Sequence, residues 1–308
     1  MISFVIPAFN EERNLPFLYE RLCAVMKQRP YEFEMIIVND GSGDATWDVI
    51  INLGTNDNRV KGINFSRNFG HQMALTAGYD CARGEAIISM DADLQDPPEV
   101  ILHMIRKWEE GSDIVYARRL DRNDGLFKKL TASVYYKILD AVSDVRIPRN
   151  VGDFRLVSKR ALDVLMSCRE HARYLRGLVA WIGFKCAYVD FVRPNRKHGV
   201  SGYSLKKMFT LALDGLAGFS IFPMKIVGYI GLLILLGSGI TLSYMMISAL
   251  LFHGPYTGSI WLSVIILLCI GFQCVALWFL GEYVGRIYEE AKGRPLYIVS
   301  ETINMNED

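Results

Sequence analysis

Residues 86–98 read AIISMDADLQDPP, an apolar run that ends in two aspartates one residue apart. A short apolar run that closes on polar residues is typical of a strand buried inside a sheet. Similar runs lie at residues 2–7, 34–39, 60–65, 114–116 and 184–191. Segments with helical periodicity, such as 15–27 and 98–110, alternate with these runs. The succession predicts an α/β fold in which a mostly parallel sheet carries helices on both faces.

Polar clusters directly follow four of these predicted strands. They begin at Pro7, Asn39, Ser66 and Asp91, and they read PAFNEE, NDGS, SRNFG and DADLQD. The carboxyl ends of parallel strands meet at one edge of a sheet, where the ligands of such sheets bind. We therefore expect the four clusters to share one rim. The sequence contains no G-x-G-x-x-G after the first strand and no G-x-x-x-x-G-K-[ST], so it indicates neither a dinucleotide fingerprint nor a P-loop.

The spacing of Asp91 and Asp93 allows the two carboxylates to share a divalent cation that also binds diphosphate oxygens. Oxygen ligands favour a hard cation, Mg²⁺ or Mn²⁺. The D-x-D tripeptide alone is weak evidence, because about one is expected by chance in a chain of this length. Its position at a strand end indicates function. The alternative for each aspartate is a loop cap, and for Asp40-Gly41 it is a plain tight turn.

Charge and cysteine content argue against nucleic-acid binding and against a cysteine metal site. The 308 residues include 34 Lys plus Arg against 33 Asp plus Glu, so no global field would collect nucleic acid. The six cysteines form no C-x-x-C pair and no metal-ligand spacing, which favours buried, unpaired thiols. Met1 leads straight into a strand-like run without a basic region or cleavage site, so we expect the N-terminal domain not to be exported.

The last third of the chain is almost continuously apolar. Residues 226–252 and 254–281 carry no charged side chain, and each stretch exceeds the roughly 20 residues that a helix needs to cross a bilayer. We expect two transmembrane helices rather than two buried helices of a large soluble core. Cations flank the outer ends of both stretches and are absent from the hairpin between them. This bias predicts a multi-pass protein of the cell membrane whose catalytic domain and both termini are cytoplasmic.

These features divide the chain into four parts. Residues 1–203 are the predicted cytoplasmic catalytic domain, in which an amphipathic segment at about 126–145 is either an interface helix or an ordinary surface helix. Residues 204–224 suit a juxtamembrane amphipathic helix, 225–282 the two transmembrane helices, and 283–308 a cytoplasmic tail. Three glycines of the first predicted span would permit close helix packing in a homo-oligomer, namely Gly231, Gly237 and Gly239.

Six motifs, in this order along the chain, resemble those of family 2 glycosyltransferases: PAFNEE, VNDGS, FSRNFGHQ, DADLQDPP, NVGDFRL and RKHGVS. The chain is similar in particular to the polyprenyl-phosphate type, which includes dolichyl-phosphate mannose synthase and bactoprenol glucosyltransferase. The resemblance extends over essentially the whole chain, through GEYVGRIY after the second predicted span. It implies a GT-A fold, a nucleotide diphosphate sugar as donor, a polyprenyl phosphate lipid as acceptor, and inversion at the anomeric carbon by one in-line displacement.

The resemblance also implies roles for individual residues. On the donor side, the nucleoside would be held at Pro7, Phe9, Glu11 and Asp40, and the metal and diphosphate at Asp91, Ala92, Asp93 and Gln95. Arginines that contact phosphate match Arg118 and Arg196, and acceptor-phosphate contacts on the amphipathic segment match Lys129 and Ser133. Asp153 matches an acidic residue beside the reaction centre. The implied catalytic set is Asp91, Asp93, Asp153 and Arg196.

The chemistry of the acceptor bears on the role of Asp153. A phosphate monoester has a second pKa of about 6, so at neutral pH it is largely a dianion that needs no strong general base. Neutralisation of charge by a metal and by arginines should therefore dominate catalysis. We expect Asp153 to orient the acceptor or an arginine, Arg155 or Arg196, or else to form a structural salt bridge.

The predicted function is transfer of a hexose, with UDP-glucose as the first candidate donor, to a polyprenyl phosphate at the cytoplasmic membrane face. Mannose from GDP-mannose, or a modified sugar, is the alternative. Gly202 stands where the family usually has a lysine. The loop therefore lacks the cationic contact that this lysine would make, and a different sugar is one interpretation of the change. A processive polysaccharide synthase would need a Q-x-x-R-W motif, which is absent, and the intact Asp91 and Asp93 disfavour a non-catalytic scaffold.

Overall fold

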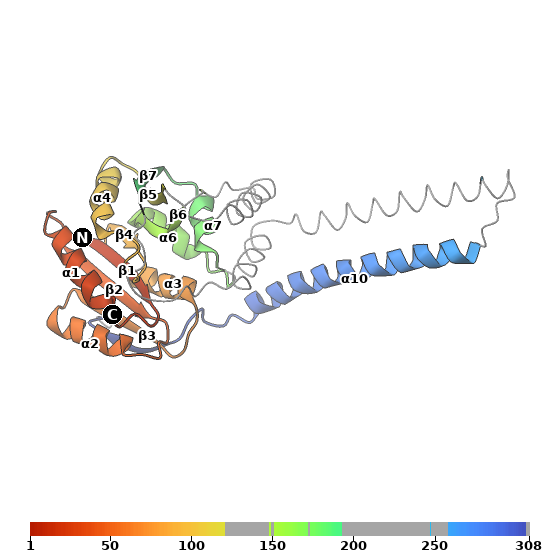
Figure 1. Ribbon diagram of the computed structural model, residues 1–308, viewed down its shortest axis with the longest axis horizontal. Helices are drawn as coiled ribbons and strands as arrows, with labels where there is room; N and C mark the ends of the chain where they lie inside the picture. The colour runs from red at the N-terminus through yellow and green to blue at the C-terminus, as the bar shows by residue number, and fades with distance from the viewer. Residues whose placement is uncertain (121–147, 149–150, 172, 193–246, 248–257, 306–308) are drawn as a thin grey trace. The chain divides into compact units, whose positions relative to one another are not determined.

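The computed structural model describes residues 1–120, 148, 151–171, 173–192, 247 and 258–305. These residues fall into two compact units (Figure 1). The first unit contains the described residues up to Val192 together with those from Pro295 onward. The second unit contains the helix α10, Gly258–Ala291. The four polar clusters identified in the sequence all belong to the first unit.

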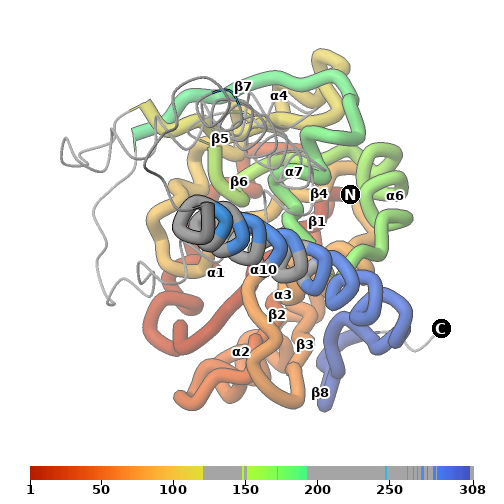
Figure 2. The backbone as a smooth tube through the Cα atoms, turned by 90° about the vertical axis from the view of Figure 1, so that its right-hand side faces the viewer, coloured from red at the N-terminus to blue at the C-terminus, as the bar shows by residue number. Residues whose placement is uncertain are grey.

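An eight-stranded sheet organises the first unit, in the order β7-β5-β6-β4-β1-β2-β3-β8. The strands are β1 Ile2–Ala8, β2 Phe33–Asn39, β3 Val60–Phe65, β4 Ala86–Ser89, β5 Ile114–Arg119, β6 Val151–Ser158, β7 Cys186–Phe191 and β8 Val299–Ile303. The parallel pairs are β1 with β2, β1 with β4, β2 with β3, and β5 with β7. β6 runs antiparallel between β4 and β5, and β8 runs antiparallel beside β3 (Figure 2). The predicted α/β class with a mostly parallel sheet is therefore confirmed.

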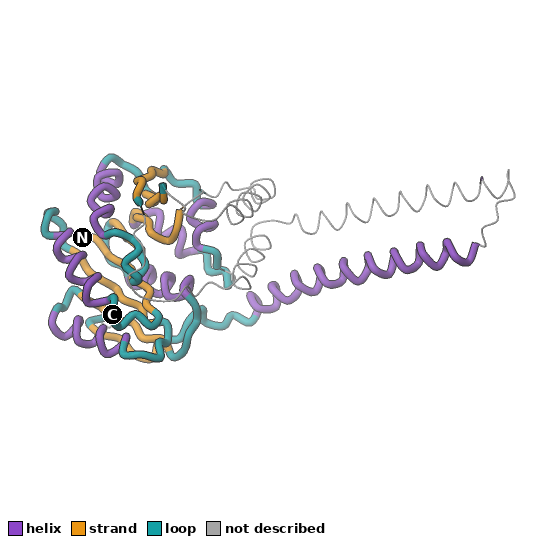
Figure 3. Tube along the Cα trace, viewed as in Figure 1, coloured by secondary structure: helices purple, strands orange, loops and turns teal. Residues whose placement is uncertain are grey.

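Helices cover both faces of this sheet (Figure 3). They are α1 Leu15–Met26, α2 Thr46–Asn56, α3 His71–Cys81, α4 Ile101–Glu109, α6 Lys159–Ser167 and α7 Leu175–Trp181, with the one-turn 3₁₀ helix η1 Pro98–Val100 before α4. Because side chains alternate along a strand, Phe4 and Ile6 enter the core that α1, α2 and α4 share, whereas Val5 faces α3. A Cβ at Gly78 of α3 would lie 2.2 Å from Val5 Cγ1, so glycine permits this close helix–sheet contact.

Two strands were not predicted as strands. β6 carries the NVGDFRL motif, and its glycine and charged residues interrupt the apolar texture that marked the other buried strands. β8 lies within the segment predicted to be a tail, yet it pairs with β3 from Gly62 to Phe65. Its residues VSETI are almost all exposed, because an edge strand is recruited by backbone hydrogen bonds rather than by burial of side chains.

The apolar last third is described only in part. The predicted segments 126–145, 204–224 and 226–252 lie outside the described residues. Within the second predicted span, the described helix α10 starts at Gly258 and continues past Gly281 to Ala291. Among the described residues, no helix combines the length and the hydropathy that crossing a membrane requires.

Candidate active site

One rim of the sheet gathers the carboxyl ends of β1, β2, β3 and β4 and, because β6 is antiparallel, the first residues of β6. The four polar clusters lie on this rim, as the sequence predicts. The backbone N–H of Asp40 donates to the carbonyl oxygen of Ala8 at 2.9 Å, which ties the end of β2 to the end of β1. The rim is therefore continuous from the first motif to the last strand that reaches it.

The loops after β1 and β2 are joined by side-chain hydrogen bonds. Asn10 N–H donates to Ser42 Oγ at 2.9 Å, and Gly43 N–H donates back to Asn10 Oδ1 at 2.9 Å. The backbone N–H of Glu11 donates to Thr46 Oγ1 at 2.8 Å. Among the predicted nucleoside contacts, Pro7 is buried within β1 and Phe9 is 49% exposed at the rim.

Asp40 holds the turn after β3 rather than presenting a free carboxylate. Its Oδ1 accepts from Phe69 N–H at 2.7 Å, and both oxygens accept from Gly70 N–H at 3.0–3.1 Å. Burial raises the pKa of Asp40, and the two N–H donors oppose that shift. The buried carboxylate thus fixes the residue that precedes α3, so its expected contact with a nucleoside would be indirect.

Gly41, two residues after the end of β2, lies directly against the backbone of the turn that follows β3, and only glycine fits there. Its φ is +64°, and a Cβ would lie 2.4 Å from the carbonyl carbon of Arg67 and 2.5 Å from the nitrogen of Asn68. We expect Gly41→Ala to lower the free energy of unfolding by about 1–3 kcal/mol, because both the backbone conformation and the contact become strained. Chemical denaturation measures this loss. Gly43→Ala is the matched control, since a Cβ there meets nothing within 4 Å; an equal loss in both variants would contradict the explanation.

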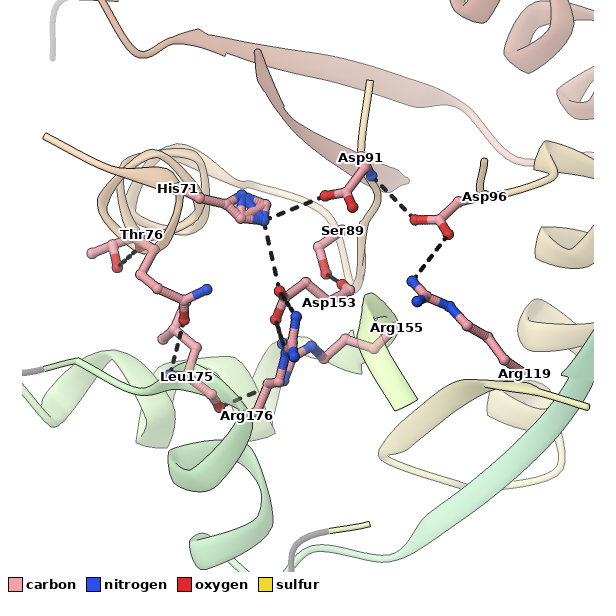
Figure 4. Close-up of polar contacts among 11 residues, drawn as sticks. His71, Thr76, Ser89, Asp91, Asp96, Arg119, Asp153, Arg155, Leu175 and Arg176 are labelled. Atoms are coloured by element: carbon pink, nitrogen blue, oxygen red, sulfur yellow. Dashed lines mark hydrogen bonds and ion pairs between the residues drawn. The ribbon is translucent and has the colours of Figure 1, made fainter. Parts of the chain in front are cut away.

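His71, the first residue of α3, faces two aspartates (Figure 4). Its Nε2 lies 3.3 Å from Asp91 Oδ1 and 3.6 Å from Asp153 Oδ2. Burial raises the pKa of Asp91; His71 lowers it, while the charges of Asp153 and Asp93 raise it further. A concentration of negative charge of this kind is the usual setting for a bound cation.

Asp153 is held by two arginines from different elements (Figure 4). Arg155 of β6 is fully buried and donates to Asp153 Oδ1. Arg176 of α7 donates to the same carboxylate through Nη2 at 2.7 Å and through Nε at 3.2 Å. Burial by itself raises the pKa of Asp153, but the charges of Arg176 and Arg155 outweigh it and hold the pKa well below the usual range. This carboxylate stays ionised, which suits an orienting group better than a proton acceptor.

The position of α7 depends on a contact with α3. The backbone N–H of Leu175 donates to Gln72 Oε1 at 3.1 Å, so the first turn of α7 is docked beside His71. This contact joins residues 103 positions apart in the sequence, and it places Arg176, the next residue of α7, beside Asp153. Neither His71 nor Arg176 was among the predicted site residues. His71 stands in the quoted FSRNFGHQ motif and was open to detection, whereas nothing in the local sequence marks Arg176.

The structure gives the two arginines at the end of β5 different partners. Arg118, the predicted phosphate contact, forms a bidentate pair with Asp190 of β7 at 2.6 and 3.0 Å. The Nη2 atom of its neighbour Arg119 instead lies 3.9 Å from Asp96 Oδ1. The other oxygen of Asp96 accepts from the backbone N–H of Asp91 at 3.4 Å. Arg119 is therefore connected to the aspartate loop, and Arg118 is not brought to it by any described contact.

The aspartate loop fits a divalent cation that completes its coordination from a ligand. The Asp91 side chain is 33% exposed, and Asp93 Oδ1 accepts from Gln95 N–H at 3.1 Å, which orders the loop between Ala92 and Gln95, both buried. In the part of the chain that the structure describes, no group of three or more His, Cys, Asp or Glu side chains would hold a metal by itself. Mg²⁺ is commonly held by one or two carboxylates plus substrate phosphates, so the loop has the right chemistry for a shared ion.

Comparison with known proteins assigns this arrangement to a family. The family model described as glycosyl transferase family 2 matches residues 3–166, a range that includes β1 to β6 and the whole rim except α7. The chain belongs to glycosyl transferase family 2. The family resemblance inferred from the six motifs is thereby confirmed.

Two relatives extend the similarity over the full length of this glycosyltransferase. It is 45% identical over 302 residues to the protein of Bacillus subtilis (strain 168) named uncharacterized glycosyltransferase YkcC, which covers 97% of this chain and 93% of that protein. It is 42% identical over 302 residues to the bactoprenol glucosyl transferase of Shigella phage SfII, which covers 98% of each chain.

A solved structure shows the same fold. The crystal structure of mannosyl-3-phosphoglycerate synthase from Rubrobacter xylanophilus matches with a TM-score of 0.50 and 17% identity, over 70% of this chain and 71% of that chain. At this identity the likeness shows the fold alone, a GT-A-like α/β sheet.

Three predicted site residues of the glycosyltransferase, Lys129, Ser133 and Arg196, lie outside the described residues, as does Gly202.

Proposed function

We propose that the protein transfers glucose from UDP-glucose to a polyprenyl phosphate, giving a polyprenyl-phosphate glucose and UDP. The observation that carries the proposal is the 42% identity, over 98% of both chains, to a protein named bactoprenol glucosyl transferase. The rim supports it, because Asp91, His71 and the Asp153–Arg176 pair bring carboxylates and cationic groups to one point. Two phosphate-bearing substrates need such a mixture to approach each other.

The proposed reaction is a single displacement. An oxygen of the acceptor phosphate forms a bond to the anomeric carbon, the bond from that carbon to the UDP oxygen breaks, and its electron pair leaves with UDP. A Mg²⁺ or Mn²⁺ ion at Asp91 and Asp93 would, when bound, neutralise charge on the leaving diphosphate. Because the acceptor is largely a dianion at neutral pH, no residue has to remove a proton. Attack from the face opposite UDP inverts the anomeric centre.

Asp153 is proposed to position cationic groups in this reaction. Its carboxylate holds Arg176, whose side chain is 29% exposed, and it rests on the buried Arg155. The partly exposed guanidinium of Arg176 is then the proposed cationic contact for a phosphate near Asp91. This assignment agrees with the low pKa of Asp153, because a carboxylate of low pKa is a poor proton acceptor and an ionised nucleophile needs no general base.

The proposal places the catalytic domain at a membrane. A polyprenyl tail leaves a bilayer only at a cost of roughly 0.8 kcal/mol for each CH₂ exposed, so the enzyme has to act at the membrane surface. The uncharged stretches 226–252 and 254–281 are the proposed anchors, with the catalytic domain and both termini in the cytoplasm. Residues 204–224 and about 126–145 are the proposed interface segments.

A donor screen tests the proposal directly. Purified full-length protein in lipid vesicles that contain a polyprenyl phosphate is incubated with UDP-glucose, UDP-galactose or GDP-mannose, each with Mg²⁺ or Mn²⁺. Mass spectrometry of the extracted lipid should show one hexose per polyprenyl phosphate, formed fastest from UDP-glucose. A faster reaction with GDP-mannose would replace glucose by mannose, a polymer would indicate a synthase, and no lipid product with any donor would overturn the proposal.

The acceptor contact is tested by Lys129→Ala. If Lys129 binds the lipid phosphate, this change should raise the KM for polyprenyl phosphate by about tenfold and leave the KM for UDP-glucose within about twofold. The measurement is steady-state kinetics with each substrate varied in turn. Lys107→Ala is the matched control, because Lys107 is partly exposed on α4 and paired with Glu110. Equal effects of Lys129→Ala on both KM values would remove the assignment.

A further inference from the structure

The chain returns to the catalytic sheet after α10 and forms a C-terminal strap, which we define as residues 295–304. The strap ends in β8, whose Glu301 Oε2 accepts from Trp47 Nε1 of α2 at 2.9 Å. Asn304 Nδ2 donates to the carbonyl oxygens of Gly54 and Val60 at 2.7 and 2.9 Å. The Asn304 contacts fasten the far end of the strap to the end of α2 and the start of β3, and the Glu301 contact joins the strap to the first turn of α2.

The near end of the strap contacts the segment that carries His71. Tyr297 OH donates to Asp80 Oδ2 at 2.8 Å, and Asp80 lies in the last turn of α3. Burial raises the pKa of Tyr297 and Asp80 raises it further, so the phenol stays protonated as a donor. The Tyr297 ring also stacks on Phe65, the last residue of β3, with ring centroids 5.1 Å apart and planes 20° apart. One side chain therefore joins the end of β3 to the last turn of α3.

These contacts continue into the rim. Phe65 packs edge-to-face on Phe69, with ring centroids 5.6 Å apart. Ser66 N–H donates to the carbonyl oxygen of Ile298 of the strap at 3.0 Å. Phe69 is the residue whose N–H is bound by Asp40, and two residues later His71 meets Asp91. Aromatic packing from Tyr297 thus supports the turn that sets the position of His71 against the aspartate loop.

We propose that Tyr297 is a positioning residue for the donor half of the active site, which it serves by holding the turn at residues 66–70 through Phe65. The inference rests on the proposed function, since it takes the rim near Asp40 and Asp91 as the donor site. A strap that only covered the edge of the sheet would stabilise the domain equally through Tyr297 and through Glu301. A positioning role instead makes donor binding sensitive to Tyr297 and insensitive to Glu301.

The test compares three variants of the full-length protein in lipid vesicles. Tyr297→Ala removes the stacking and the hydrogen bond and should raise the KM for UDP-glucose about tenfold, with the KM for polyprenyl phosphate within about twofold. Tyr297→Phe keeps the ring and should restore the donor KM to within about threefold of the wild type. Glu301→Ala, which loses a strap contact to Trp47, should lower the thermal unfolding midpoint while leaving the donor KM unchanged.

Each outcome decides for or against the inference. An unchanged donor KM in Tyr297→Ala, or an equal rise in the KM for donor and acceptor, would overturn it. If Tyr297→Ala does not fold, Tyr297→Leu keeps apolar bulk without a stacking ring and should show the same rise. Calorimetric binding of UDP with Mn²⁺ separates this inference from the proposed function. If UDP binds more weakly to the alanine variant and the wild type transfers no glucose, the proposed function is contradicted, whereas the positioning role of Tyr297 is supported.

Discussion

Asp91→Asn should lower kcat/KM for glucose transfer by about a thousandfold, or roughly 4 kcal/mol of transition-state stabilisation. The neutral amide is a weaker ligand than a carboxylate for the divalent cation that would neutralise the leaving diphosphate. The substitution is nearly isosteric, so the other side chains of the rim should keep their positions. Steady-state transfer of labelled glucose into extracted lipid measures this loss. Asp93→Ala is expected to act in the same direction, with a loss on the order of 3 kcal/mol.

The same Asp91→Asn variant should fold at least as well as the wild type. Burial and the charges of Asp153 and Asp93 raise the pKa of Asp91, so its ionised form is disfavoured in the folded protein without a cation. At neutral pH the substitution removes that penalty, and the thermal unfolding midpoint should stay equal or rise. Asp163→Asn is the control, because Asp163 pairs with Lys159 at the exposed start of α6 and should change neither activity nor stability. Near-normal turnover in Asp91→Asn would remove the metal assignment.

Asp153→Asn should be the most destabilising single change at the rim, lowering the free energy of unfolding by about 3–5 kcal/mol. The change leaves the fully buried Arg155 without its carboxylate partner. Chemical denaturation measures the loss. Asp113→Asn is the matched comparison, since that buried carboxylate pairs with Arg160, whose side chain is 70% exposed and can return to water. A loss in Asp153→Asn no larger than in Asp113→Asn would contradict the role of buried charge.

The pH dependence of this stabilisation has a definite sign. The pKa of Asp153 is lowered in the folded state, so its contribution is present above the ordinary aspartate pKa of about 4 and is lost as the pH falls through the folded value. The stability difference between the wild type and Asp153→Asn should therefore be constant from about pH 5 to about pH 8 and shrink only in acid. For the same reason, no activity loss in that window should trace to Asp153.

Much of the fold is legible in the sequence, because buried parallel strands need continuous apolar runs. The runs at 2–7 and 60–65 match β1 and β3 to within a residue, and the clusters after them occur on the rim as predicted. β8 was missed for a physical reason: its VSETI residues are exposed, and backbone pairing with β3 leaves no periodic signature.

The side-chain contacts at the site could be predicted from the sequence less well than the fold. Arg118 and Arg119 are adjacent, and successive strand residues point to opposite faces, so the choice between them depends on strand register. A register shift between Tyr116 and Arg118 alters that register, and the sequence alone does not reveal it. Arg176 reaches Asp153 only because Gln72 docks α7 beside α3, a tertiary contact without a local pattern.

Transfer of label from UDP-glucose to lipid, measured side by side for the wild type and Asp91→Asn, tests whether the aspartate loop catalyses glucose transfer to a polyprenyl phosphate. Full-length protein in vesicles with a polyprenyl phosphate is supplied with labelled UDP-glucose and Mg²⁺ or Mn²⁺, and the organic extract is counted and resolved. We expect one labelled monosaccharide lipid phosphate from the wild type and almost none from Asp91→Asn. Equal labelling by both proteins, or label that stays entirely in water with the wild type, would contradict it.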